Sequence, residues 1–233
     1  MSQSQQLALW PEIPDFSYSA TKLRRITKPK PVLLPFAANP VRYSELVLAS
    51  ASPSKADILT RLGLKFSVDP ADIDERAISY PSPQELVAEL ARRKGFVVAE
   101  RHEEALVISA DTLIVGPSGV IGKPIDRADA LRTLSELNGR SHTVITGLMV
   151  VDTTAKVNAQ RLVATDVRFR SQSEESLSRY VFTGEPMGKA GAYALQGIGA
   201  LLVAEIKGEY TNVLGLPVSA LVDALFELGY EVI

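Results

Sequence analysis

The sequence contains no cysteine and only two histidines, His102 and His142. The first absence excludes disulfide bonds, thiolate zinc sites and a cysteine nucleophile, and it favours the reducing cytoplasm as the compartment. The scarcity of histidine excludes a site with three or more histidines from one chain. Any metal ion would therefore be held by carboxylates or by substrate phosphates, which favours Mg²⁺ or Mn²⁺.

Charge and hydropathy argue against two further classes of protein. With 25 basic and 27 acidic residues the net charge is −2, so no global positive field attracts a nucleic-acid polymer or an anionic membrane. No apolar run reaches the roughly 18 residues of a membrane span, and the start MSQSQQLALWPEIPDF lacks the regions of a signal peptide. We expect a globular cytoplasmic protein without membrane or nucleic-acid partners, in which any phosphate binding is local.

The distribution of proline divides the chain into two parts. Six of the 14 prolines lie in residues 1–44, which show no regular apolar periodicity, and this composition is typical of an extended arm. Residues 45–233 show alternating strand and helix patterns without repeats. We therefore predict a proline-rich amino-terminal extension followed by one α/β or α+β domain.

Capping residues and apolar spacing locate the elements of that domain. Residues 45–50 predict a buried strand, and Ser52 with Pro53 predicts a helix that stops at Gly63. Later helices are expected to begin at Ser82, Asp126, Ser173 and Pro217. Strands are expected within 105–122, where GPSG indicates a hairpin, within 142–152 and 161–170, joined through 153–160, and within 200–206.

The junction LASASPSKADIL, within the strand-to-helix segment, combines small residues, hydroxyls and one charge. The unpaired N–H groups of a helix start attract anions, and small residues let a phosphate come close. Ser50 and Ser52 add hydroxyl donors, and Lys55 adds a full charge. Two interpretations stay open here, a phosphate-binding turn and a serine that only caps the helix.

Two acidic residues are candidates for catalysis or metal binding. Asp111 lies inside the apolar segment VISADTLIV, where a lone buried carboxylate is costly unless it faces a metal, a partner charge or a cleft. The alternative is an aspartate at a strand end or bulge. Glu75, in DIDER, has a blander alternative, because acidic loops are usually only solvated.

Other polar residues also have both a functional and a structural interpretation. Lys123, in GKP, could reach a phosphate, although GKP is a common turn, and Lys94 could simply lie on the solvated face of its helix. In GKAGAYALQG, Tyr193 and Gln196 offer stacking and an amide that can bind a base edge, unless the segment is a plain glycine-rich turn. His142 enters a strand and is interpreted as structural.

Taken in order, these segments resemble the Maf family of nucleoside triphosphate pyrophosphatases. LASASPSKADIL is similar to its amino-terminal phosphate loop, ADTLIV to its catalytic-aspartate strand and GKP to its lysine loop. LNGRSHTVITG is similar to its central strand, and GEPMGKAGAYALQG with NVLGLP to its carboxy-terminal signature. The resemblance covers about residues 45–230, and the ordered set is specific although each motif is weak alone. KAGAYALQG resembles the branch that acts on dTTP and UTP.

The resemblance implies a two-lobed α/β fold with a mixed sheet, of the Maf and inosine triphosphatase type, with a central cleft and usually a homodimer. It implies hydrolysis of a nucleoside triphosphate to the monophosphate and pyrophosphate with Mg²⁺ or Mn²⁺. By this analogy Asp111 accepts a proton from the attacking water and binds the metal, which Glu75 helps to hold. The positions expected to bind substrate are Ser50, Ser52, Ser54, Lys55, Lys94, Thr112, Lys123 and Gln196, of which Thr112 and Gln196 would help to select the base.

One departure from the family concerns the phosphate loop. The family commonly has Ser-Pro-Arg-Arg where this chain has Ser52, Pro53, Ser54 and Lys55. Lys55 keeps a charge but lacks the bidentate fork of arginine, and Ser54 carries no charge. A rival hypothesis is therefore a nucleotide-binding regulator linked to cell division, as has been proposed for the family, in which hydrolysis is weak or lost.

Overall fold

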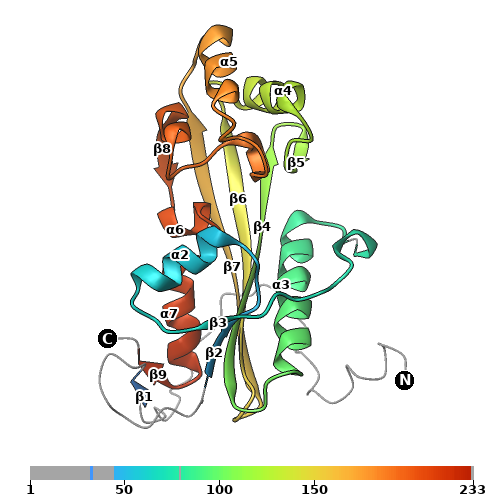
Figure 1. Cartoon of the computed structure of the whole chain (residues 1–233), viewed down its shortest axis with the longest axis vertical. Coiled ribbons are helices and arrows are strands. Elements are labelled where there is room, and N and C mark those ends of the chain that lie inside the picture. Colours follow the sequence, from blue (N-terminus) through green and yellow to red (C-terminus); the bar gives the residue numbers. More distant parts are fainter. Residues whose placement is uncertain (1–31, 34–44, 79, 232–233) are drawn as a thin grey trace, which may run out of the picture.

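The computed structural model describes residues 32–33, 45–78 and 80–231 (Figure 1). Of the predicted extension it describes only strand β1 (Val32–Leu33), which pairs in parallel with β9 (Tyr230–Glu231). The rest of residues 1–44 lies outside the described part. Within the described ranges, no helix has the length and apolar character needed to cross a membrane.

A mixed sheet of seven strands forms the centre of the molecule, in the order β3-β2-β4-β6-β7-β8 with β5 paired to β4. Its strands are β2 (Glu45–Leu48), β3 (Ser67–Val68), β4 (Ala105–Gly116), β5 (Gly119–Ile121), β6 (Ser141–Asp152), β7 (Val157–Phe169) and β8 (Val203–Lys207). Strand β2 is parallel to both β3 and β4, and the remaining pairs are antiparallel. The predicted α/β class is confirmed, as is the hairpin of β4 and β5.

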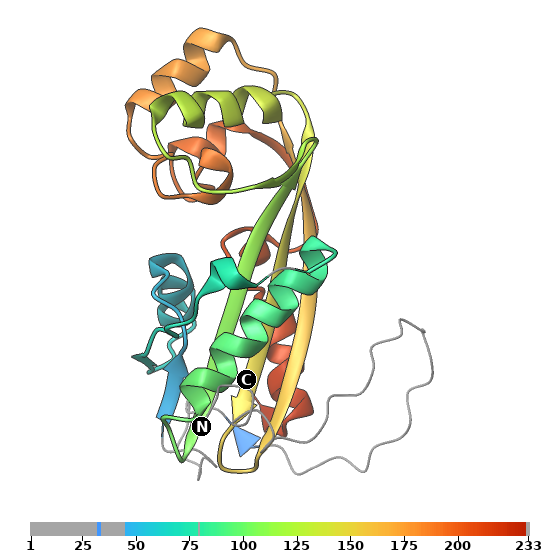
Figure 2. The same cartoon turned by 90° about the vertical axis from the view of Figure 1, so that its right-hand side faces the viewer.

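Helices cover this sheet in two lobes (Figures 1 and 2). The α-helices are α2 (Pro53–Arg61), α3 (Pro83–Ala99), α4 (Arg127–Leu137), α5 (Glu174–Phe182), α6 (Tyr210–Val213) and α7 (Val218–Glu227), and short 3₁₀ helices are η2 (Glu75–Ala77), η3 (Ala190–Ala192) and η4 (Ile198–Leu202). Helices α2, α3 and α7 lie in one lobe, whereas α4 and α5 lie in the other with β5 and β8 (Figure 1). The long strands β4, β6 and β7 run through both lobes, and the expected cleft between the lobes stays a prediction.

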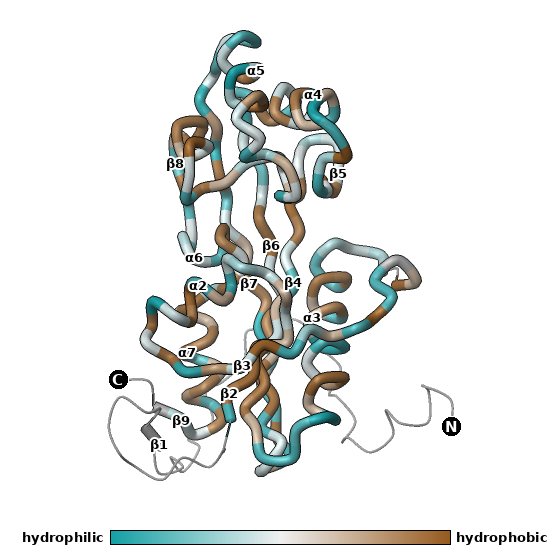
Figure 3. Tube along the Cα trace, viewed as in Figure 1, coloured by the Kyte–Doolittle hydropathy of each residue, from teal (hydrophilic) through white to brown (hydrophobic). Residues whose placement is uncertain are grey.

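Each lobe has its own apolar core. In the first lobe one cluster lies around α2 and α7, with Leu59, Leu148 and Leu225 buried, and a second lies between α3 and the sheet. The second lobe is built around α4, α5 and the far ends of β6 and β7, with Leu134 and Phe169 buried. Apolar stretches follow the long strands and the helices beside them (Figure 3). The two lobes therefore bury their apolar surface separately on strands that they share.

The predicted helix starts are largely confirmed by hydrogen bonds at the caps. The side chains of Ser82, Asp126 and Ser173 each accept a bond from the backbone N–H three residues later, which satisfies a donor that has no partner within the helix. Ser52 also precedes its helix, but its side chain makes no capping bond. Ser52 therefore occupies the predicted cap position, but its side chain is not used to cap the helix.

Two boundaries differ from the prediction. The reversal between β6 and β7 takes only residues 153–156, because Asp152 Oδ1 accepts the N–H groups of Thr154 and Ala155 and tightens the turn. The strand expected from residue 200 begins at 203. Residues 200–202, which were expected to start this strand, belong to η4. The first two N–H groups of η4, those of Ile198 and Gly199, donate to the carboxylate of Glu185 rather than to a neighbouring strand.

Candidate active site

Helix α3 packs close to the sheet because small residues lie where they meet. A Cβ at Gly147 on β6 would lie 2.3 Å from the carbonyl oxygen of Val87, and a Cβ at Gly95 would lie 2.8 Å from Ser109 Oγ. Ser109 is fully buried and donates to the carbonyl of Ala91 at 2.7 Å. This packing fixes the carboxy-terminal half of α3, which carries Lys94, against β4, which carries Asp111.

Lys94, on this part of α3, holds two carboxylates. Its Nζ lies 2.5 Å from Asp111 Oδ1 and 2.7 Å from Glu75 Oε1. Burial lowers the pKa of Lys94, but the charges and hydrogen bonds of Asp111 and Glu75 outweigh it, so the pKa is raised overall. Lys94 therefore remains an ammonium, and its side chain is only 13% exposed rather than lying on a solvated face.

Asp111 lies in the middle of a strand rather than at its end. It is paired opposite Gly147 within the continuous register of β4 and β6, so the alternative of a strand end or bulge does not apply. Its side chain is 13% exposed and is bound to Lys94. The carboxylate thus has a partner charge, as the cost of burying it requires.

Lys55, on the first turn of α2, is buried without a counter-ion. Its residue is 8% exposed, and among the described residues no carboxylate lies within ion-pair distance of it. Its pKa is lowered to about 8, chiefly by burial; the charges of Asp111 and Glu75 raise the pKa, whereas those of Lys94 and Lys123 lower it. Asp111, Lys94, Lys123 and Glu75 are therefore all close enough to influence the charge of Lys55.

The serines of the junction surround the start of α2. The N–H of Ser52 donates to Ser50 Oγ at 3.2 Å, and both residues are partly buried. Pro53 occupies the first turn of the helix, where its missing N–H costs no helix bond. Ser54 is exposed on the same turn. The turn is thus ordered by Ser50, while the side chain of Ser52 remains available near the positive end of the helix.

Thr112 belongs to a small hydroxyl network beside Lys55. Thr112 Oγ1 lies 2.9 Å from Thr146 Oγ1 and donates to the carbonyl of Gly215 at 3.4 Å. Gly215 has a φ of +102°, and a Cβ there would lie 3.3 Å from Lys55 Nζ. Sequence reasoning missed Thr146 and Gly215, although the paired strands around Thr112 and the NVLGLP motif were the signals that could have indicated them.

The remaining predicted residues lie farther along the chain in loops. Lys123 is exposed in the loop between β5 and α4, and this loop is tied to the Gln196 region by the N–H of Gly191, which donates to the carbonyl of Gly122 at 3.2 Å. Gln196 is exposed, and its side chain makes no hydrogen bond to another described residue. The charge of Lys123 is thus close enough to affect Lys55. For Gln196, the described residues show no hydrogen bond to any of the other predicted site residues.

His142 is a structural residue, as predicted. Its Nε2 lies 2.9 Å from the Tyr193 hydroxyl, and its ring packs edge-on against the rings of Phe169 and Tyr193. It is 2% exposed, and burial lowers its pKa to about 4. The ring is therefore neutral and belongs to the core of the second lobe.

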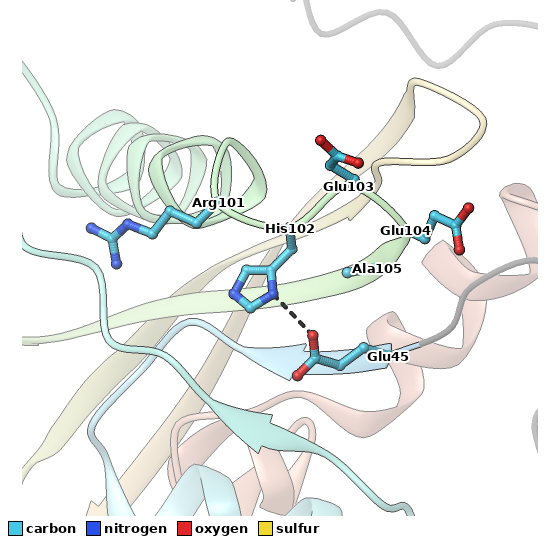
Figure 4. Close-up of a pocket in the computed structure, with 6 residues that line it drawn as sticks. All are labelled: Glu45, Arg101, His102, Glu103, Glu104 and Ala105. Carbon is cyan, nitrogen blue, oxygen red and sulfur yellow. Dashed lines mark hydrogen bonds and ion pairs between the residues drawn. The ribbon is translucent and has the colours of Figure 1, made fainter.

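A second polar region lies around His102, apart from the lysines and carboxylates described above. A hollow of about 330 Å³ lies where the turn between α3 and β4 meets the start of β2 (Figure 4). There His102 Nδ1 lies 2.9 Å from Glu45 and its Nε2 lies 3.1 Å from Asp69. The hollow is lined by none of Lys55, Lys94, Lys123, Glu75 and Asp111, so the two polar regions are separate.

Comparison with known proteins agrees with the arrangement of these motifs. The family described as Maf-like protein matches residues 45–228. The dTTP/UTP pyrophosphatase of Pelotomaculum thermopropionicum is 47% identical over 189 residues, which are 81% of this chain and 99% of that protein. Those of Desulforamulus reducens and Symbiobacterium thermophilum are 43% and 45% identical over 188 residues, 81% of this chain and 98% and 96% of the relatives. The chain therefore belongs to the Maf family.

Proposed function

We propose that this protein is a nucleoside triphosphate pyrophosphatase that hydrolyses a pyrimidine nucleoside triphosphate, dTTP or UTP, to the monophosphate and pyrophosphate. The names of its relatives support the reaction and the base. The observation that supports it most directly is the convergence of Lys55, Lys94 and Lys123 with the carboxylates of Asp111 and Glu75. Such a set combines cations for a polyphosphate with a carboxylate for water.

The cations suit a triphosphate because one of them is buried without a partner in the described protein. A buried ammonium without a counter-ion is costly, and a phosphate oxygen would supply the missing negative charge. Lys55 is in this position at the start of α2, whose dipole favours the same anion. In the proposal Lys55 and Lys123 bind the phosphates, together with the serines of the junction at 50, 52 and 54.

The two carboxylates fit a divalent cation. Mg²⁺ is commonly held by one or two carboxylates together with substrate phosphates rather than by a closed protein cage. Asp111 and Glu75 each use one oxygen for Lys94 and keep the other, and the described residues contain no cluster of three or more ligands that would form such a cage. We propose that they hold Mg²⁺ or Mn²⁺, which when bound would neutralise charge on the phosphates.

Asp111 is the proposed general base. Water attacks phosphorus at the anhydride bond that separates the monophosphate from pyrophosphate, and Asp111 accepts its proton. Lys94 orients the carboxylate through Oδ1, which leaves Oδ2 for the water or the metal. The lysines stabilise the negative charge that passes to the leaving pyrophosphate. Thr112 and Gln196 are proposed to help select the base.

The first test is the substitution Asp111→Asn. We expect pyrophosphate release to fall by roughly 100-fold or more, the usual range for a lost general base, while the circular dichroism spectrum and the melting curve stay close to those of the wild type. Asp223→Asn, at an exposed position on α7, is the matched control and should keep full turnover. Wild-type turnover in Asp111→Asn would show that the base is assigned wrongly.

The second test is a substrate panel of common and modified triphosphates, each with Mg²⁺ and with Mn²⁺. We expect dTTP and UTP to release pyrophosphate faster than the purine triphosphates. Tight binding without turnover of any of them would favour the rival hypothesis of a nucleotide-binding regulator.

Two further properties belong to the same proposal. A homodimer is proposed from the family resemblance, and sedimentation equilibrium of the full chain tests it. A cytoplasmic location is proposed from the absence of cysteine, and cell fractionation tests it.

A further inference from the structure

We propose that Glu185 is a positioning residue that holds the loop bearing Gln196, and thereby contributes to selection of the base. The inference rests on the proposed function for its substrate. The Gln196 loop is defined here as residues 194–199. Glu185 Oε2 accepts the N–H of Ile198 at 2.9 Å, and Oε1 accepts the N–H of Gly199 at 2.8 Å. One carboxylate therefore ties down the end of the loop.

Tyr180 extends this anchor to the start of the loop. Its hydroxyl donates to Glu185 Oε1 at 2.8 Å and accepts the N–H of Ala194 at 3.2 Å. Burial raises the pKa of Tyr180, and the bond to Glu185 raises it further, so the hydroxyl stays protonated and donates. The carboxylate and the phenol together bind both ends of the Gln196 loop.

The glycines of the loop are explained by the same anchor. A Cβ at Gly197 would lie 2.2 Å from Glu185 Oε2, and a Cβ at Gly199 would lie 2.6 Å from the hydroxyl of Tyr180. A side chain at either position would push the loop away from its two partners. The two glycines of QGIG therefore allow the loop backbone to approach Glu185 and Tyr180 closely.

Gln196 lies between Ala194 and Ile198, whose backbone N–H groups are bound to the anchor. Its side chain is exposed and bonds to no other described residue, so the amide is available to a ligand. An amide has both donors and an acceptor, which complement the N–H and carbonyl groups of a thymine or uracil edge. A loop that is ordered in advance reduces the entropy lost on binding. Loss of the Glu185 anchor should therefore weaken nucleotide binding and base discrimination more than the chemical step.

The experiment is a double-mutant cycle between Glu185→Gln and Gln196→Ala. Each single variant should raise the KM for dTTP about tenfold, keep kcat within about threefold, and reduce the preference for dTTP over dATP by a similar factor. The double variant should be no worse than either single variant, because both changes remove the same interaction. Glu174→Gln, which removes the same charge at an exposed position on α5, is the control and should behave as wild type.

Three kinetic outcomes contradict the inference. These are an unchanged KM in Glu185→Gln, a loss confined to kcat, and losses that simply add in the double variant. If Glu185→Gln does not fold, Tyr180→Phe replaces it, since it removes only the hydroxyl that bonds to Glu185 and Ala194. We expect a smaller rise in KM from Tyr180→Phe, again absent in the Gln196→Ala background. No rise in KM would overturn the inference.

Failure of the proposed function can be recognised separately. If the wild type releases pyrophosphate from no triphosphate, the function fails, and calorimetric titration with dTTP then replaces the kinetics. Weaker dTTP binding in Glu185→Gln, with no further loss in the Gln196→Ala background, would still support the role of Glu185. Equal binding by wild type and Glu185→Gln, or no binding by the wild type, would overturn it.

Discussion

The ammonium of Lys55 illustrates how one side chain can link substrate binding to pH. It is buried, it has no carboxylate partner among the described residues, and its pKa is lowered to about 8, first by burial. A phosphate beside it would favour the charged form and raise that pKa. At a pH between the pKa of Lys55 in the free protein and its pKa in the complex, Lys55 is largely neutral before binding and charged afterwards. Nucleotide binding must then take up a proton, so the affinity falls as pH rises.

The first prediction at this scale is therefore a rise in KM on the alkaline side. Below about pH 8 the KM for dTTP should vary little with Lys55 protonated, and above it the KM should increase by up to about tenfold per pH unit. Lys55→Arg should remove this increase, because arginine stays charged throughout. Lys123→Arg, at an exposed lysine, is the matched control and should keep it. Identical pH profiles for Lys55→Arg and the wild type would contradict the argument.

Single residues also show what the sequence could indicate and what it could not. Lys55, Lys94 and Asp111 lie in motifs whose chemistry is visible from residue type, and the structure places them together. Thr146 and Glu185 were not found, because they act by bonding to another site residue or to the backbone of a loop. Such roles depend on which strand lies opposite or which turn lies nearby, and neither is visible in a local pattern.

At the scale of elements, the close packing of α3 against β6 determines where Lys94 lies. Gly147 makes this possible, since a Cβ there would lie 2.3 Å from the carbonyl oxygen of Val87. Helix backbone cannot yield as a flexible side chain can. A methyl group at this position must therefore shift α3 and, with it, the ammonium that orients Asp111.

The prediction is that Gly147→Ala lowers both stability and turnover. The free energy of unfolding should fall by about 1–3 kcal/mol, the usual cost of overpacking, and kcat should fall because Lys94 no longer meets Asp111 in the same geometry. Urea denaturation and pyrophosphate release measure the two effects. Gly122→Ala is the control for stability, since nothing lies within 4 Å of its added Cβ. A wild-type stability for Gly147→Ala would show that α3 is not held as described.

Elements also show where local prediction succeeds and where it stops. The starts of α3, α4 and α5 were predictable because each cap bonds to a backbone group three residues away. The start of β8 was not, since Ile198 and Gly199 donate to Glu185 rather than to the sheet. The same apolar residues could have formed a longer strand, and a distant carboxylate decides the outcome.

At the scale of the whole molecule, the α/β class follows from the alternation of patterns, but the site depends on topology. Strands β4 and β6 are antiparallel, which places Asp111 opposite Gly147 and Thr112 opposite Thr146. A shift of one residue would turn Asp111 to the other face of the sheet. That register is fixed by two apolar cores on strands shared by both lobes, and this long-range agreement is not contained in any single motif.

His142 provides a test of how the second lobe responds to acid. Its ring is buried against Phe169 and Tyr193, and burial lowers its pKa from 6.5 to about 4. The unfolded chain therefore binds a proton near pH 6.5, whereas the folded protein resists it until about pH 4. The stability due to the neutral ring is fully present above pH 6.5 and is lost as pH falls toward 4.

We expect this loss to reach roughly 3 kcal/mol, from a pKa difference of about two and a half units. The measurement is the free energy of unfolding in urea at several pH values between 4 and 7.5, for the wild type and for His142→Gln. The variant should be less stable at neutral pH, since it disturbs the contact with Tyr193, but its stability should decline less steeply with acid. His102→Gln, at the other histidine, should keep the steep decline. Glutamine does not titrate, so any dependence of the unfolding free energy on pH that remains in His142→Gln comes from other groups. If the unfolding free energy of the variant falls as steeply with acid as that of the wild type, protonation of a different group weakens the fold.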